Sequence, residues 1–343
     1  MVSSPLVIIF FTIILTAASP ILGKITVNNS AINEKLTLDF YKQKCPNVEQ
    51  VVMDVMKRST KKNPGWIPGI IRLHFHDCFI TGCDASILIT PERYNGFASE
   101  LAHPLNGASI RGLDAIHEIK SELEKQCPGV VSCADILSYA ARDAAVLAGH
   151  PHYSIPAGRR DGFSVDGNRA HDLPAGSSTV EHLAEMYAAR GLTMEDLVVL
   201  EGAHSIGRAT CQLSIANTDT LKGATGAEEV LDKKFAAAVL NRYCPKSGDL
   251  QELRVPLNPE KLDSDWGVSF YDNIIKGKGL IGADLAMAAN GNTKEMVHQY
   301  ARDSEIWKKK FSEAMIKLGK VNVISGEEGE IRKHCSVLNT VNI

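Results

Sequence analysis

The sequence has little that would hold it in a membrane. Its longest apolar run, Val7 to Ala18, spans only about a dozen residues, which is too short to cross a bilayer as a helix. A short apolar run at the amino terminus, followed by small residues, is typical of a cleaved secretory signal. We therefore expect a signal peptide at residues 1–23 and a mature protein of residues 24–343 with no membrane span. The sequon Asn28-Asn29-Ser30 is consistent with secretion.

Long runs of one charge are absent as well. The longest basic run is Lys308-Lys309-Lys310, and the formal net charge is −3 with a pI near 6.4. This balance gives no general attraction to nucleic acid, so we expect no nucleic-acid partner. With 44% hydrophobic and 22% charged residues, the chain has the composition of an ordinary globular protein, long enough for two lobes around a large core.

Strand-like alternation is scarce and there is no internal repeat, whereas helix signals recur. Segments 132–149 and 193–207 each open with a pattern that resembles a capping box and close with glycine, and the second contains His204. A third predicted helix runs from Ile306 to Leu318. Residues 151–176, rich in Gly, Pro and Asp, predict a long loop between two lobes. These patterns favour an all-α fold.

Cysteine pairs with the Cys-x-x-Cys spacing of a zinc site are missing, which argues against a structural zinc protein. The mature chain nevertheless contains eight cysteines, an even number that predicts four disulfide bonds in an oxidising compartment. Eight cysteines allow 105 pairings. Spacing alone indicates only a short loop between Cys78 and Cys83.

One short stretch, residues 70–86, concentrates reactive side chains. If its first half is helical, Arg72, Phe75 and His76 share one face, so that a cation, an aromatic ring and a base point the same way. The carboxylates and the hydroxyl that follow offer hard oxygen ligands for a metal ion. A buried helix end with ordinary histidines is the alternative. The density of polar groups that are costly to bury favours a functional site.

A second polar motif, residues 201–207, places a single histidine, His204, among small residues near a helix end. Neutral imidazole is a common metal ligand, and small neighbours would let a planar macrocycle approach the backbone. Taken alone, the motif also suits an ordinary histidine stabilised by the helix dipole.

Taken together, the motifs resemble the secreted plant haem peroxidases of class III. The resemblance rests on Arg72 to Cys78 with Gly82 to Ser86, Val131 to Asp135, Gly158 to Asp161 and Gly202 to Gly207. It runs from about Leu36 to Leu338, essentially the whole mature chain. It implies an all-α, two-lobed helical haem peroxidase fold with very little β. Haem b would lie between a distal lobe, about residues 36–165 plus the C-terminal helix, and a proximal lobe, about residues 166–305.

The resemblance implies catalytic roles on the distal side of the haem. His76 would take a proton from hydrogen peroxide and return it to the departing oxygen. Arg72 would stabilise the negative charge that develops as the O–O bond breaks. Asn106 would hold the other nitrogen of His76, and Phe75 would lie over the haem.

On the proximal side, the resemblance implies that His204 is the axial iron ligand and that Asp284 accepts the N–H of its imidazole. Pro174 matches a residue at the exposed haem edge, where phenolic donors dock in this family. The chain departs from the family pattern at Gly176, where a second proline is common, and at Leu213, where some relatives carry an aromatic ring. It also departs at Glu201, where a small residue is common before Gly-Ala-His; nothing in the sequence explains this glutamate.

Two calcium sites are implied by the resemblance. The distal ligands would be the side chains of Asp77, Asp84 and Ser86 and the backbone carbonyls of Ile80 and Gly82. The proximal site matches less well. Ser205 stands where threonine is usual and Gly267 where an aspartate is expected, so Asp263 or Asp265 would have to compensate.

The same resemblance implies structural pairings. The disulfides would join Cys45 to Cys127, Cys78 to Cys83, Cys133 to Cys335 and Cys211 to Cys244. Asp135 and Arg159 would form a buried ion pair, and His74 would have a structural role.

These expectations describe a secreted haem peroxidase, a monomer of the extracellular space or cell wall, that reduces hydrogen peroxide while oxidising phenolic small molecules. A haem binder without peroxide activity is the alternative that the altered proximal segment favours. A calcium- or zinc-dependent hydrolase built on His76 and Asp77 is a further alternative, but the sequence has no nucleophile elbow or zincin motif.

Overall fold

The computed structural model describes residues 36–90, 99–106, 109–164, 166–245, 249–259 and 266–340. The expected signal peptide, the sequon at Asn28, and Asp263 and Asp265 lie outside these ranges.

Helices dominate the described residues, as the sequence predicted. The α-helices are α2 (Val48–Lys62), α3 (Trp66–Ile80), α4 (Leu113–Gln126), α5 (Cys133–Leu147), α6 (Val180–Ala188), α7 (Met194–Glu201), α8 (Thr218–Gly223), α9 (Ala227–Val230), α10 (Lys233–Tyr243), α11 (Val268–Ile275), α12 (Gly282–Ala289), α13 (Lys294–Arg302) and α14 (Ser304–Leu318). Short 3₁₀ helices are η1 (Ser86–Leu88), η3 (Gly167–Asp172), η4 (Gly202–Ser205) and η5 (Cys211–Leu213).

The β-structure in the described residues consists of two short antiparallel pairs and two isolated bridges, Thr37 with Ala157 and Asp161 with Glu330. Strand β1 (Arg159–Arg160) pairs with β4 (Ile324–Ser325), and β2 (Arg208–Thr210) pairs with β3 (Arg254–Pro256). The predicted loop at residues 151–176 is therefore interrupted by β1 and η3. The prediction of an all-α fold with very little β is confirmed.

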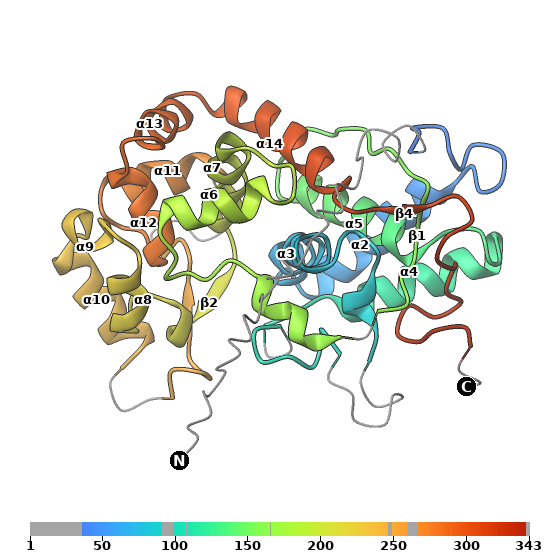
Figure 1. Ribbon diagram of the computed structural model, residues 1–343, viewed down its shortest axis with the longest axis horizontal. Coiled ribbons are helices and arrows are strands. Elements are labelled where there is room, and N and C mark those ends of the chain that lie inside the picture. Colours follow the sequence, from blue (N-terminus) through green and yellow to red (C-terminus); the bar gives the residue numbers. More distant parts are fainter. Residues whose placement is uncertain are drawn as a thin grey trace, which may run out of the picture.

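The helices form two groups that lie side by side (Figure 1). Helices α2 to α5 pack against one another in one group, and α11, α12 and α13 pack together in the other. Helix α14 contacts both α7 and α3, so it bridges the groups. In the described residues, no helix is both long enough and apolar enough to span a bilayer.

The predicted capping signals are present at both helix starts. The Ser132 hydroxyl accepts a hydrogen bond from the backbone N–H of Asp135 at 3.1 Å, which begins α5. Thr193 and Asp196 form a complete capping box at the start of α7. The starts of these helices could therefore be predicted from the local sequence, because a cap involves residues only three positions apart.

The predicted end of the second helix is wrong. Helix α7 stops at Glu201 rather than at Gly207, and His204 lies on η4. The carbonyl of Val199 accepts the indole N–H of Trp307 at 3.1 Å, and the hydroxyl of Tyr271 donates to Val198 O at 2.9 Å. These distant side chains occupy acceptors of the last turn, which favours a tighter 3₁₀ continuation.

The cross-links match the pairing that the family resemblance implied. The structure contains disulfides Cys45–Cys127, Cys78–Cys83, Cys133–Cys335 and Cys211–Cys244. Arg159 and Asp135 also form the expected buried pair, with Nη1 and Oδ1 2.8 Å apart.

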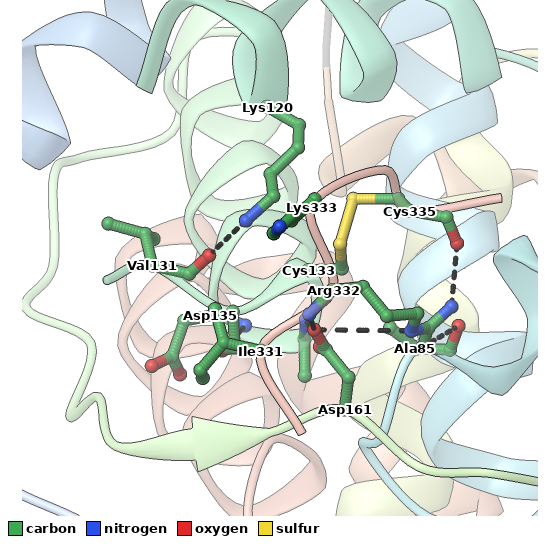
Figure 2. The surroundings of a disulfide bond; sticks show 12 residues. Ala85, Lys120, Val131, Cys133, Asp135, Asp161, Ile331, Arg332, Lys333 and Cys335 are labelled. Carbon is green, nitrogen blue, oxygen red and sulfur yellow. Dashed lines mark hydrogen bonds and ion pairs between the residues drawn. A yellow bond between two sulfur atoms is a disulfide. The ribbon is translucent and has the colours of Figure 1, made fainter. Parts of the chain in front are cut away.

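The C-terminal segment is fastened to α5 and to the turn after α3 (Figure 2). Cys335 is joined to Cys133 at the start of α5. The buried guanidinium of Arg332 donates to the carbonyl of Ala85 at 2.8 Å, and its backbone N–H donates to Asp161 at 2.9 Å. This anchoring fixes the backbone that follows the reactive stretch at residues 70–86.

Candidate active site

Helix α3 carries the distal candidates. Arg72, Phe75 and His76 lie on it as predicted, and the Phe75 ring stacks on that of Phe79 with centroids 4.9 Å apart. His74 is buried on the same helix and contacts the sulfur of Cys78 at 3.6 Å, which fits the structural role that was expected of it. The aromatic contacts hold the helix face that presents the base and the cation.

A short hydrogen bond orients the distal imidazole. Nδ1 of His76 lies 2.6 Å from Oδ1 of Asn106, and both residues are buried. The amide nitrogen of Asn106 donates to the carbonyl of Glu100 at 2.8 Å, so its Oδ1 must face the ring. Nδ1 of His76 is therefore the donor, and Nε2 carries the lone pair of a proton acceptor.

Burial sets the charge states on this side. Burial, reinforced by the charge of Arg72, holds the pKa of His76 well below 6.5, so the imidazole is neutral at physiological pH. Burial also lowers the pKa of Arg72 to about 10, which still leaves its guanidinium charged. Nε of Arg72 is buried and has no hydrogen-bond partner among the described residues. A neutral base thus lies near a cation that has a donor to offer.

The proximal candidates come together from α7, η4 and α12. Nδ1 of His204 lies 3.1 Å from each carboxylate oxygen of Asp284. It also lies 2.9 Å from Oε2 of Glu201, a contact that sequence reasoning missed. Asp284 and Glu201 are 4% and 12% exposed, whereas the His204 side chain is 35% exposed. One edge of this imidazole is therefore enclosed by carboxylates while part of the ring remains open.

The two carboxylates dominate the electrostatics of the proximal histidine. Burial alone would lower the pKa of His204, but Asp284 and Glu201 outweigh it and raise this pKa well above 6.5. Burial raises the pKa of Asp284 in spite of the neighbouring imidazole. The proximal ring is thus held in a strongly negative environment, the opposite of the distal one.

These residues fit a haem group. An axial ligand needs one nitrogen held by a hydrogen bond and the other accessible to the metal, and His204 has its Nδ1 at the carboxylates and its ring partly open. Two buried carboxylates beside one imidazole also leave an excess of negative charge that a ferric centre would offset. On the other side, the partnerless Nε of Arg72 fits a ligand with polar atoms.

A cluster of buried carboxylates lies at the end of α3. One oxygen of Asp77 accepts the backbone N–H of Ala85 at 3.1 Å, and its other oxygen has no partner in the described residues. Burial together with Asp84 and Glu100 raises the pKa of Asp77 well above 3.8, and burial raises that of Glu100 to about 8. Mutually repelling, partly unsatisfied carboxylates are what a divalent cation would neutralise.

Glu100 is a member of this cluster that the sequence did not reveal. Its Oε1 accepts the hydroxyl proton of Ser86 at 3.1 Å, and its Oε2 is buried without a partner among the described residues. The segment 99–106 that carries Glu100 also carries Asn106. The carboxylate cluster and the hydrogen bond to His76 are thus coupled through one short segment.

The predicted proximal calcium ligands have other partners here. The Ser205 hydroxyl donates to the carbonyl of Gly202 and accepts from the backbone N–H of Gly267, both at 2.9 Å. Gly267 has φ +92°, and a Cβ there would come within 2.0 Å of the Trp307 ring. No aspartate fits at position 267, because Trp307 fills the space. Among the described residues Ser205 is thus the one predicted ligand at this place, and the candidates Asp263 and Asp265 lie outside them.

The predicted substrate edge lies between η3 and α6. Pro174 is partly buried, and Leu213 is 37% exposed. The carbonyl of Gly176 accepts the N–H of Ala283 at 2.8 Å, and a Cβ at Gly176 would touch Ile281 at 3.0 Å. Close contact with the start of α12 explains glycine rather than a second proline at this position.

Comparison with known proteins places these findings in a family. A family model described as Peroxidase matches residues 50–303. Peroxidase 5 of Vitis vinifera is 37% identical over 310 residues, which cover 90% of this chain and 93% of the relative. Peroxidase 49 of Arabidopsis thaliana is 37% identical over 310 residues, with 89% and 92% covered, and Peroxidase 1 of Zea mays is 36% identical over 312 residues, with 89% and 83% covered.

The matched region includes both candidate histidines, their partners Asn106 and Asp284, and the carboxylate cluster. Since the family model spans most of the chain and the relatives align over nearly their whole length, this chain belongs to the peroxidase family, among the plant class III peroxidases.

Proposed function

We propose that this protein is a secreted haem peroxidase that reduces hydrogen peroxide to water and oxidises phenolic donors by one electron at a time. His204 would hold the haem iron. When bound, haem supplies the two-electron reduction of peroxide and the single-electron oxidation of donors. Class III relatives and the absence of a spanning helix in the described residues support an extracellular or cell-wall protein, which we expect to be monomeric.

The observation that carries the proposal is the bond between Nδ1 of His76 and Oδ1 of Asn106. It leaves Nε2 of His76 as a neutral acceptor that can take one proton of peroxide. The same nitrogen can then return that proton to the departing oxygen, so that water leaves instead of hydroxide. Arg72 stays charged and has a free donor for the oxygen on which negative charge develops.

The proximal residues would keep His204 in one orientation. Asp284 accepts the Nδ1–H and so leaves Nε2 for the metal. A carboxylate at this position also makes the imidazole a stronger electron donor. Pro174, at the partly buried edge between η3 and α6, would be where a phenolic donor docks.

We also propose a distal calcium ion held by Asp77, Asp84, Ser86 and the carbonyls of Ile80 and Gly82. The buried carboxylates with raised pKa values support it, because a cation would remove their mutual repulsion. Its role would be to fix the end of α3 and the segment that carries Asn106.

Substitution of His76 tests the catalytic proposal. His76→Ala should slow the reaction with hydrogen peroxide by about 10²- to 10⁴-fold while haem content stays near that of the wild type. Stopped-flow spectroscopy of the purified holoprotein measures this rate. His182→Ala, at a histidine of α6 that is 61% exposed, serves as the control. Wild-type kinetics in His76→Ala would refute the role of the distal base.

Substitution of His204 tests the axial role separately. His204→Ala should retain less haem after gel filtration than the wild type, because the bond to iron is lost. Full haem retention with an unchanged absorption spectrum would contradict axial ligation. A protein that binds haem through His204 but shows no spectral response to peroxide would be a haem binder without peroxidase activity.

A further inference from the structure

A second carboxylate, Glu201, lies beside the proximal histidine. Its Oε2 is 2.9 Å from Nδ1 of His204, nearer than either oxygen of Asp284 at 3.1 Å. Nδ1 of His204 hydrogen-bonds to Asp284, and Glu201 lies within hydrogen-bonding distance of both His204 and Asp284. Glu201 thus adds a negative charge on the flank of a nitrogen that already has its acceptor.

The position of Glu201 is unusual for a carboxylate, although the hydroxyl of buried Tyr187 also hydrogen-bonds to it. It is the last residue of α7, where the helix dipole disfavours a carboxylate. It is also only 12% exposed, and its one ion pair within the described chain is with His204. The other acidic residues of α7 pair with lysines: Glu195 with Lys310 and Asp196 with Lys317, each at 2.8 Å. Only Glu201 is directed to the candidate iron ligand.

The local backbone produces this contact. Helix α7 ends at Glu201 and continues as η4, so residues 201 and 204 are separated by one 3₁₀ turn, in which side chains three positions apart line up. Gly202 permits the turn to pack closely, since a Cβ there would come within 2.5 Å of Trp307 Nε1. The contact is therefore built into a tightly packed turn.

We propose that Glu201 is a positioning residue that acts with Asp284 on His204, making the imidazole more electron-donating and the bound haem harder to reduce. The inference rests on the proposed axial role of His204. A negative charge close to the ligand stabilises the ferric form relative to the ferrous form, and low exposure weakens screening by solvent. Glu201 is also near enough to accept the Nδ1–H if Asp284 is removed.

The experiment measures the haem midpoint potential and the iron–histidine stretching frequency of the ferrous holoprotein by resonance Raman spectroscopy. Glu201→Gln keeps the size of the side chain and removes its charge, so the potential should rise and the stretching frequency should fall. Glu201→Ser, which restores a small residue, should shift both in the same direction. Glu195→Gln, at the other end of α7, should match the wild type.

Asp284→Asn provides the positive control and the second half of a double-mutant cycle. Asp284→Asn alone should raise the midpoint potential. The rise that Asp284→Asn causes should be larger in the Glu201→Gln variant than in the wild type, because no carboxylate then remains to accept the Nδ1–H. A shift for Asp284→Asn with none for Glu201→Gln or Glu201→Ser would overturn this inference and leave the proposed function intact. A wild-type holoprotein without a histidine-ligated haem spectrum would instead refute the proposed function.

Discussion

The two histidines of the candidate site differ in what contacts their Nδ1 atoms. His76 donates to the neutral amide of Asn106, whereas His204 lies between the carboxylates of Asp284 and Glu201. The pKa of His76 is consequently far below its ordinary value and that of His204 far above it. One side chain type can thus serve as a neutral proton acceptor on one side and, in the function we propose, as an electron-rich metal ligand on the other.

The comparison teaches that the partner of Nδ1, rather than burial, distinguishes the two roles. Burial lowers the pKa of both imidazoles. An amide partner stabilises the imidazolium form only weakly, so on the distal side burial and Arg72 prevail. Carboxylates stabilise it strongly and prevail on the proximal side. Replacing the amide partner of a histidine by a carboxylate, or the reverse, should therefore shift the pKa of that histidine toward the value of the other one.

The largest effect in such an exchange is expected at the distal side. Asn106→Asp would place a carboxylate at Nδ1 of His76, and an opposite charge at this distance raises a pKa by about 1–3 units. Below the raised pKa the ring is protonated and cannot accept the proton of peroxide. The rate with peroxide should fall about tenfold for each pH unit below the raised pKa, at pH values where the wild type is still active, and should recover as the pH rises. Stopped-flow measurements from pH 4 to pH 9 test this shift.

The wild type and a neutral variant provide the reference for this pH profile. In the wild type, the rate should stay constant through pH 6.5 and fall only at more acidic pH, because the pKa of His76 is well below 6.5. Asn106→Leu should be slower because the ring loses its orientation, but its profile should not move to alkaline pH. A profile for Asn106→Asp that overlies the wild type would show that the partner of Nδ1 does not set the charge of the distal base.

Calcium should have the next largest effect, confined to the distal side. At a calcium concentration 100 times its dissociation constant, binding adds about 2.7 kcal/mol to the free energy of unfolding. For a chain of this size we expect a rise in Tm of about 5 °C. Differential scanning calorimetry with calcium or with a chelator measures the shift, and metal analysis counts the ions. One calcium ion per chain would agree with a distal site alone. Two calcium ions would show a proximal site that is completed by residues outside the described ranges.

The calcium effect should also depend on pH with a definite sign. In the folded metal-free protein the pKa of Glu100 is raised from 4.5 to about 8. The folded state therefore binds more protons than the unfolded state between these values, and its stability falls as the pH rises through this window. Calcium binds the deprotonated carboxylates and opposes that fall. The gain in Tm on adding calcium should be larger at pH 8 than at pH 5, and an equal gain would contradict a cation that neutralises the carboxylate cluster of Asp77, Asp84 and Glu100.

How much of this the sequence could predict depends on the separation of the residues involved. The distal helix face was predictable because Arg72, Phe75 and His76 lie within one turn and a half of α3. Apart from the short loop between Cys78 and Cys83, which spacing indicated, the disulfides and the site of Asp284 came only from the family resemblance. Neither periodicity nor spacing brings together α12 and η4, which lie some 80 positions apart in the chain.

The rest could not be predicted, because it depends on contacts between distant segments. The end of α7 is set by Trp307 and Tyr271. Without knowledge of where α7 ends, Glu201 would not be recognised as a partner of His204. The same Trp307 excludes a side chain at Gly267, the unexpected residue of the proximal segment. One buried tryptophan thus contacts both the last turn of α7 and the backbone at Gly267, and only the folded structure shows it.

The smallest effect on stability is expected from Glu195, in the first turn of α7. It provides a comparison for Glu201, the last residue of the same helix. Glu195 contacts Lys310 at 2.8 Å and Tyr300 at 2.9 Å, but its side chain is 39% exposed and that of Lys310 is 35% exposed. An ion pair this open to solvent contributes only about 0.2–1 kcal/mol to the free energy of unfolding, so Glu195→Gln should lower Tm by about 1–2 °C.

The stabilisation by this ion pair should depend on pH. The bond to Lys310 holds the pKa of Glu195 below 4.5, so the stabilisation is present at neutral pH and is lost as the pH falls through that lowered pKa. The Tm difference from the wild type should therefore vanish in acid and shrink in high salt. A loss of several degrees, or a change in the haem potential, would mean that the charge of Glu195 acts on the proximal side as Glu201 does, and the distinction between the two ends of this helix would fail.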